Sequence, residues 1–220
     1  MLSFRAMSMR PIHRKDIAIL AACLAAALPA APTQAAEEFS LTFFGGIRDG
    51  GYFEDVNSGD RLDIEGSPSF AAAMEFPLDA GRRLQFFLSY QDTSLDLTPA
   101  LGPSPTVATE LPMKVMYLHV GGPVFFTGDT SHGAYVVGGL GATLFSPSGA
   151  YDDELRASAN LGIGYQQPLG EHFAMRIEAR GYFTLVNSSG GMFCSGGCVV
   201  AIRGEGTVQG EISLGLVFRP

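Results

Sequence analysis

The chain has 220 residues, enough for one domain of ordinary size, and only 16% of them are charged. It is rich in glycine (28 residues) and proline (13 residues), and its mean hydropathy is positive. These features favour a β-rich protein with an apolar surface over a helical enzyme. The formal net charge of −8 argues against nucleic-acid binding, which needs a basic face.

The N-terminal segment has the three parts of a secretory signal peptide. A basic part is followed by the apolar run 17–28 and then by small residues, with cleavage expected after Ala35 or Ala36. The run has 12 residues, whereas a membrane-spanning helix needs about 20. The alternative is a lipoprotein signal at LAAC, which ends at Cys23, but the apolar run continues beyond this cysteine. The basic residues are Arg5, Arg10, Arg14 and Lys15.

We therefore expect a cleaved signal peptide (1–36) and a mature domain (37–220). Cleavage would remove four of the 14 basic residues and one of the 22 acidic residues, leaving a net charge of −11. The mature domain would keep two cysteines, Cys194 and Cys198. An even number of cysteines in an exported protein indicates a disulfide. The alternative, a zinc or redox pair, is disfavoured because the C-x-x-x-C spacing has no further ligands.

Apolar and polar residues alternate in segments of about ten residues, as in strands with one oily and one polar face. In MRIEARGYF (175–183), Arg176, Glu178 and Arg180 fall on one face and apolar residues on the other. The segment 113–126 is apolar on both faces, so the pattern leaves its inward side open. The eight predicted strands are 38–48, 69–78, 83–91, 113–126, 133–145, 155–165, 175–183 and 208–218.

The connections between these strands alternate in length. Short turns are expected at 79–82, 127–132 and 169–172, and long polar or glycine-rich loops at 48–68, 92–111, 146–154 and 187–207. This arrangement predicts an all-β fold, an eight-stranded antiparallel up-and-down transmembrane β-barrel. The alternative is a soluble β-sandwich, in which the oily faces would share one core.

Five stretches, in this order and spacing, resemble a family of small proteobacterial outer-membrane β-barrel proteins. The resemblance implies an OmpA/OmpX-type barrel in the cell outer membrane, insertion by the outer-membrane assembly machinery and no established activity. It also leads us to expect a monomer surrounded by outer-membrane lipids and lipopolysaccharide. The stretches are FFGGIRDGGYFED, FPLDAGRRLQFFLSYQDTSLD, YLHVGG, VVGGLGATLFSP and RGYFTLVNSSGGMFCSGGC.

Two features depart from the pattern of such barrels. The aromatic residue expected at the end of the chain is Phe218, two residues early, and the chain has no tryptophan. We therefore expect Tyr90, Tyr135, Tyr165 and several phenylalanines to lie at the membrane interfaces.

Seven charged residues fall on faces predicted to point into the barrel. Its lumen is just wide enough for side chains to fill, and buried charges must be paired. We expect a structural ion-pair network, in which Arg176, Glu178 and Arg180 pair with Glu75 or Glu211. The alternative is a proton or ion path, which would make the protein a narrow porin for small solutes. The seven residues are Arg48, Glu75, Arg156, Arg176, Glu178, Arg180 and Glu211.

The sequence has no motif for catalysis, a metal or a cofactor. The acidic stretches 55–65 and 151–154 do not match the spacing of a calcium loop, so we expect solvated loops. A lipid-modifying enzyme, the third hypothesis, would need a histidine within reach of a serine and an acid, and His119 is the one histidine in a predicted strand. The leading expectation is a non-enzymatic outer-membrane barrel with a structural or surface-interaction role.

Overall fold

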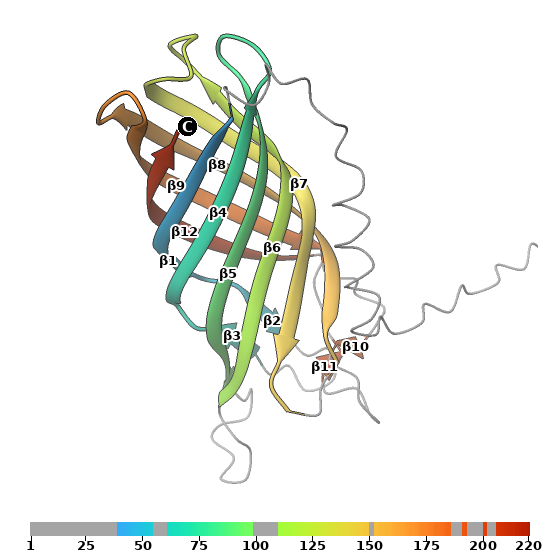
Figure 1. Ribbon diagram of the computed structural model, residues 1–220. Coiled ribbons are helices and arrows are strands. Elements are labelled where there is room, and N and C mark those ends of the chain that lie inside the picture. The colour runs from blue at the N-terminus through green and yellow to red at the C-terminus, as the bar shows by residue number, and fades with distance from the viewer. Residues whose placement is uncertain are drawn as a thin grey trace, which may run out of the picture. The chain divides into compact units, whose positions relative to one another are not determined.

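The computed structural model describes residues 39–54, 61–98, 110–149, 152–185, 191–192, 200–201 and 206–220. In this part of the chain no helix is long and apolar enough to cross a membrane. Eight long strands form the fold (Figure 1). They are β1 (Ser40–Asp49), β4 (Ser67–Pro77), β5 (Arg83–Thr98), β6 (Glu110–Phe125), β7 (Gly133–Pro147), β8 (Glu154–Pro168), β9 (Phe173–Leu185) and β12 (Gly206–Phe218).

The eight strands close into an antiparallel barrel, which confirms the predicted fold class. Neighbours in the sheet run in the order β5-β4-β1-β12-β9-β8-β7-β6, and a further ladder between β5 and β6 completes the ring. The first and last long strands pair with each other, from Leu41 opposite Phe218 to Asp49 opposite Gly210. The soluble sandwich is therefore wrong for this chain, because a sandwich has two separate sheets.

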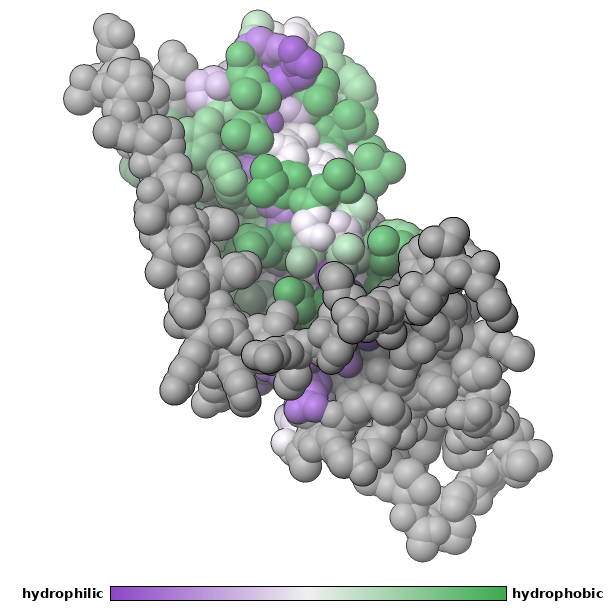
Figure 2. All heavy atoms as spheres, turned by 90° about the vertical axis from the view of Figure 1, so that its right-hand side faces the viewer, coloured by the Kyte–Doolittle hydropathy of each residue, from purple (hydrophilic) through white to green (hydrophobic). Residues whose placement is uncertain are grey.

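Burial alternates residue by residue along the strands, so one face of each strand points into the barrel and the other points outward. In β9 the pattern is unbroken, with Arg176, Glu178 and Arg180 buried and their neighbours exposed. The wall carries large exposed apolar side chains on all eight strands, and Figure 2 shows them as green atoms over the face in view. We name this outer surface the apolar belt.

Large members of the apolar belt include Phe43, Ile47, Phe70, Met74, Phe86, Leu88, Met116, Leu118, Val120, Leu140, Leu155, Leu161, Ile163, Tyr165, Met175, Ile177, Phe183, Val208, Ile212, Leu214 and Leu216.

The two ends of the barrel differ as expected. The turns after β4, β6 and β8 lie together with the C-terminal end of the chain, at the top of Figure 1. The short strands β2 (Tyr52–Glu54) and β3 (Arg61–Ile64) lie at the opposite end, and so do β10 (Gly191–Met192) and β11 (Val200–Ala201). We refer to these as the turn end and the loop end.

Two of the predicted loops contain strand. The stretch 92–111 was expected to be a loop, but β5 continues to Thr98 and β6 begins at Glu110. The loop expected at 48–68 contains β2 and β3, which pair with each other, and β3 also pairs with β5. These segments escaped notice because each contributes only a short alternating run, such as Leu62 and Ile64 next to Arg61 and Asp63, within a largely polar stretch.

The structure also settles the orientation of two segments. In β6, Tyr117 and His119 are buried and their neighbours Leu118 and Val120 are exposed, which assigns the inward side that the sequence left open. Tyr135 was expected at a membrane interface, but its side chain is buried inside the barrel. Its segment, β7, is too rich in glycine for the pattern to reveal which face is inward.

Close approach of β6 and β7 requires glycine at position 141. A methyl group on Gly141 would overlap the carbonyl oxygen of Leu118, whereas one on Gly45 in β1 would meet no atom within 4 Å. We predict that Gly141→Ala lowers the free energy of unfolding by about 1–3 kcal/mol, as overpacking does. Gly45→Ala, the matched control, should be neutral or slightly stabilising. Urea unfolding of the detergent-folded barrel measures both; equal stability of the two variants would contradict the prediction.

Candidate functional site

The lumen contains most of the charged residues that the sequence placed there. The strands β1, β4, β9 and β12 supply them, because alternation along each strand sends every second side chain inward. Six are almost fully buried, and they form three groups that follow one another through the bore. These six are Arg48, Glu75, Arg176, Glu178, Arg180 and Glu211.

The first group surrounds Glu75, near the turn end. Arg176 donates two parallel hydrogen bonds to its carboxylate, at 2.5 and 2.8 Å. The Gln85 amide donates a third, at 2.7 Å, and Nε of Arg83 lies 3.4 Å from the same carboxylate. Such two-bond arginine–carboxylate pairs are both strong and geometrically specific. The pair joins β4 to β9 across the bore, since these strands are not neighbours in the sheet.

The second group is centred on Glu178. Nε of Arg180 donates to its carboxylate at 2.8 Å, and the Tyr135 hydroxyl donates to it at 2.7 Å. The guanidinium of Arg180 also lies 3.9 Å from the centre of the Phe87 ring. A guanidinium over an aromatic face is an attractive contact. In the folded barrel, the Glu178 carboxylate and the Phe87 ring therefore replace the water that would otherwise solvate the Arg180 guanidinium.

The third group is centred on Arg48 and Glu211, which face each other on β1 and β12. Two guanidinium nitrogens donate to one carboxylate oxygen, at 2.8 and 2.5 Å, and a further bond joins Arg48 to the Ser89 hydroxyl. The rings of Tyr117 and Tyr182 stack on each other at 4.3 Å, and the Arg48 guanidinium lies 4.9 and 4.6 Å from their centres. This layer fills the middle of the bore with aromatic and charged side chains.

Two expected pairings differ in the structure. Arg180 pairs with Glu178 on its own strand, not with Glu75 or Glu211, because Glu75 is taken by Arg176 and Glu211 by Arg48. Arg156 lies apart from the three groups. It pairs with Glu154 at 3.0 Å, and both side chains are about one-fifth exposed at the loop end.

Sequence reasoning missed a contact between a histidine and a serine inside the barrel. His119 Nε2 lies 2.9 Å from the Ser158 hydroxyl oxygen, although their strands β6 and β8 are separated by β7. The contact crosses β7 at Gly141, which pairs with both residues and has no side chain in the way. The sequence gives little sign of this contact beyond the position of His119 two residues after Tyr117, on the same face of the strand.

This pair lacks the third member of a catalytic triad. His119 Nδ1, the atom that would face an orienting acid, has no hydrogen-bond partner among the described residues. Both His119 and Ser158 are buried, and Ser158 also lines a pocket in the wall with Leu140 and Phe183 of the apolar belt. His119 therefore lies within hydrogen-bond reach of a serine, as a catalytic histidine would, but its Nδ1 has no acid within reach among the described residues.

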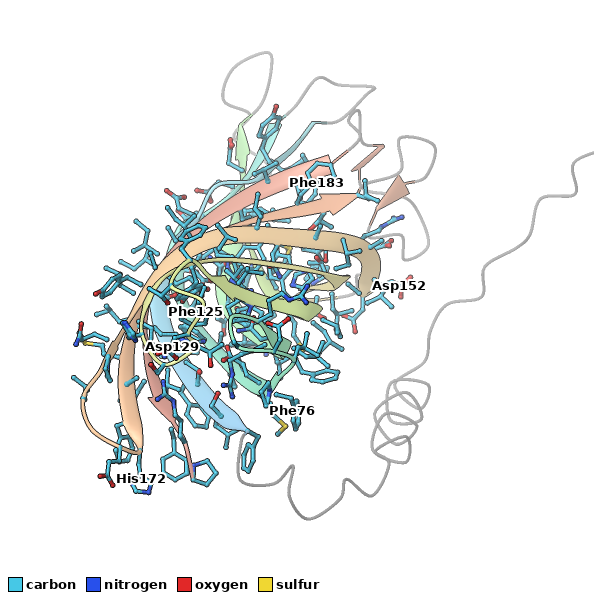
Figure 3. All side chains as sticks on the ribbon, turned by 90° about the horizontal axis from the view of Figure 1, so that it is seen from above. Phe76, Phe125, Asp129, Asp152, His172 and Phe183 are labelled. Carbon is cyan, nitrogen blue, oxygen red and sulfur yellow. The ribbon has the colours of Figure 1, made fainter. Side chains whose placement is uncertain are left out.

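The turn between β6 and β7 covers the turn end of the lumen. Gln166 donates to the carbonyl oxygens of Thr130 and Ser131, at 3.0 and 2.7 Å, and Arg219 donates to that of Ser131 at 3.0 Å. Figure 3, seen from this end, shows Asp129 close to the middle of the ring of strands. Hydrogen bonds from the Ser131 hydroxyl and backbone hold the pKa of Asp129 below its usual range.

The loop end of the lumen is filled by apolar side chains instead of charges. We name these six buried residues the apolar plug: Phe53, Ile64, Leu95, Met113, Val115 and Phe145. The rings of Phe53 and Phe145 meet edge to face, with centres 5.7 Å apart. Covered by the turn, filled by ion pairs and closed by the plug, the lumen has side chains packed along its length.

Other predicted sites lie partly outside the described residues. Cys194, Cys198 and residues 55–60 are among those that the structure does not describe, as is the segment 1–36. In the described ranges, no three His, Cys, Asp or Glu side chains gather as metal ligands would.

Comparisons with known proteins bear on the fold. Neisserial surface protein A (NspA) is similar in structure, with a TM-score of 0.53 and 11% sequence identity, over 83% of this chain and 97% of NspA. The likeness shows a shared barrel fold. Ail, the attachment invasion locus protein of Yersinia pestis, gives a TM-score of 0.42 at 14% identity, over 82% of this chain and 99% of Ail.

The outer membrane protein AlkL gives a TM-score of 0.49 at 16% identity, over 86% of this chain and 93% of AlkL. No protein-family model matches the chain, and the comparison with curated proteins gives no match.

The ion pairs of the lumen predict a large cost for removing one carboxylate. Glu75→Gln should leave Arg176 buried without its counter-charge, and breaking a buried pair costs about 3–5 kcal/mol. Glu154→Gln removes the partly exposed partner of Arg156 and should cost less than about 1 kcal/mol. Thermal unfolding of the two variants in the same detergent measures the difference. Equal melting temperatures would show that the network does not hold the barrel together.

Proposed function

We propose that the protein is an integral outer-membrane β-barrel with a structural or surface-interaction role, without a conducting pore and without enzymatic activity. The observation that carries this proposal is the distribution of polarity: large apolar side chains cover the outside of every strand, and the buried charged residues lie on the inside. A soluble protein rarely exposes an apolar patch of more than a few hundred Å². Lipid is the solvent that suits the apolar belt, and a closed barrel leaves no open sheet edge to it.

The proposed location includes an orientation. Outer-membrane barrels place short turns in the periplasm and longer loops outside the cell. The turn end would therefore face the periplasm, and the loop end, with β2 and β3, would face the exterior. Export would depend on the predicted signal peptide (1–36). The predicted disulfide between Cys194 and Cys198 would close a small ring in the last external loop.

The packed lumen supports a barrel that does not conduct. An eight-stranded barrel encloses a bore that side chains just fill. Here the buried layer of Arg48, Tyr117 and Tyr182 crosses the middle of that bore. We expect no sustained current through the purified protein in a planar lipid bilayer. Steady single-channel conductance would reject the proposal and favour the narrow porin.

The absence of enzymatic activity is proposed on the geometry of His119. Its ring is enclosed in the lumen beside the stacked rings of Tyr117 and Tyr182, whose centres lie 5.6 and 6.0 Å away. A lipid substrate would approach from the belt, where Ser158 lines a pocket in the wall but His119 does not. Release of fatty acid from phospholipid vesicles by the wild-type barrel, lost in His119→Ala, would overturn this part of the proposal.

Membrane placement predicts that a charge on the belt is costly only at mid-height. Leu161 lies at the middle of β8 and is 72% exposed, and Leu169, in the turn after β8, is 61% exposed. Leu161→Arg should lower the unfolding free energy in lipid vesicles by about 2–4 kcal/mol, whereas Leu169→Arg should cost about 0–1 kcal/mol. Chemical unfolding in vesicles measures both. If both substitutions were equally tolerated, the belt would not lie in a membrane.

A further inference from the structure

We propose that a groove in the apolar belt, formed by β7, β8, β9 and β12, is a binding site for one acyl chain of a phospholipid in the leaflet at the turn end. The inference rests on the proposed function and deepens it, because it names a lipid partner and the surface that receives it. It is carried by the lining of the groove, by the closure of the groove from the lumen and by its height on the barrel.

Small residues form the floor of the groove. Ala134, Gly164 and Ala179 line it on three neighbouring strands, and with the larger residues around them they enclose about 510 Å³. Other outward positions of the same wall carry large side chains, such as Leu161 on β8 and Met175 on β9. Sites for small molecules measure about 300–1,000 Å³. The groove therefore has the size of a site for a small ligand.

Large apolar side chains border this floor, and each of them is between 37% and 69% exposed. A lipid chain on a smooth wall touches protein along one side, whereas a chain in the groove touches the floor and both borders. Dispersion contacts are weak one by one and large in sum, so the additional contacts favour the groove over the rest of the belt. The bordering residues are Phe126, Ile163, Tyr165, Ile177 and Ile212.

The polar residues next to the groove are occupied inside the barrel. Tyr135 and Glu178 also line the groove, but both are buried, and the Tyr135 hydroxyl donates to the Glu178 carboxylate at 2.7 Å. Arg180 donates to the same carboxylate at 2.8 Å. The Tyr135 ring lies against Gly164, where an added methyl group would overlap it. The ion pair therefore belongs to the lumen, and the surface that the groove offers a ligand is apolar.

The groove extends from the turn end toward the middle of the belt. Phe126 directly follows β6 and Ala134 is the second residue of β7, whereas Ile212 lies six residues before Phe218, the last residue of β12. Six residues of a tilted strand span a depth of about 14 Å. Half of the hydrocarbon core of a bilayer is about 15 Å thick. An acyl chain covers the same depth, from its head group to the bilayer centre.

The height of the groove identifies the lipid. In the proposed orientation the turn end faces the periplasm, and in an outer membrane phospholipids form the periplasmic leaflet and lipopolysaccharide the outer one. Tyr165 lies three residues before Pro168, the last residue of β8. Tyrosine suits this level, because its ring is apolar and its hydroxyl can reach the head groups. The occupant is therefore a phospholipid chain and not a chain of lipopolysaccharide.

A single tryptophan at the border of the groove tests the proposal, because the chain has none of its own. Tyr165→Trp, folded in detergent, is titrated with a phospholipid that carries bromine, a quencher, on its acyl chains. We expect quenching that saturates at equimolar lipid. Met74→Trp is the matched control on β4, across the barrel and likewise three residues from the turn-end limit of its strand. Its quenching should rise with partitioning into micelles and not saturate.

Filling the floor should remove the site. In the Tyr165→Trp background, Ala179→Leu places a larger side chain in the groove and should raise the half-saturating lipid concentration at least roughly tenfold, about 1.4 kcal/mol. Ala72→Leu, on the outward face of β4, is the matched control and should leave that concentration unchanged. Ala134→Leu fills the other end of the floor and replaces Ala179→Leu if that variant fails to fold.

The outcomes distinguish this inference from the membrane proposal, because the titration in detergent does not depend on membrane insertion. Uptake of the barrel by lipid vesicles measures insertion separately. Failed uptake with saturable quenching that Ala179→Leu weakens would reject the membrane location and keep the lipid site. Normal uptake with quenching that never saturates, or that saturates equally in Ala179→Leu, would keep the location and overturn the site.

A second copy of the chain is the competing occupant of the groove. Sedimentation of the detergent-folded barrel measures the oligomeric state, and we expect a monomer both in the wild type and in Ala179→Leu. A wild-type dimer that dissociates in Ala179→Leu would assign the groove to a second copy and overturn the lipid site.

Discussion

An antiparallel ladder that closes on itself keeps its backbone donors and acceptors within the wall, and this closure decides where each side chain can point. Once β5 pairs with β6, every second residue of a strand faces a narrow bore and every other one faces outward. A charge on such a strand has two destinations, lipid or lumen. Arg176 points inward, and its burial then demands the counter-charge of Glu75 on a strand that lies across the barrel.

The buried polar side chains of the lumen form specific pairs. The Glu75 carboxylate accepts hydrogen bonds from Arg176 and Gln85, and the Glu178 carboxylate accepts them from Tyr135 and Arg180. Gln85 links these two groups, because its amide oxygen also accepts a hydrogen bond from Arg180 at 3.2 Å. Glycines on the inner wall give these long side chains room. A side chain at Gly164 would collide with the Tyr135 ring, whose position over that glycine lets its hydroxyl reach β9.

Most of the barrel could be predicted from residues that alternate cleanly. The segments 155–165 and 175–183 showed both their strand character and their inward faces, and the structure agrees. Prediction failed where that physical signal is absent. Tyr135 lies among glycines, β6 is apolar on both faces, and the ends of β5 and β6 extend beyond the apolar belt. Pairing partners such as Arg48 and Glu211 are 163 positions apart, and only the folded topology determines which carboxylate each arginine meets.

The position of one ion pair bears on how the barrel is assembled. Arg48 and Glu211 face each other across the seam where the first and last long strands meet. Ladder hydrogen bonds alone do not specify this seam, since a slip of two residues keeps the same faces inward. Such a slip would set Arg48 opposite Gln209 or Ser213. The Arg48 guanidinium would then remain beside Tyr117 and Tyr182 without the Glu211 carboxylate as its counter-charge. The pair thereby stabilises the correct register of β1 and β12 over a slip of two residues.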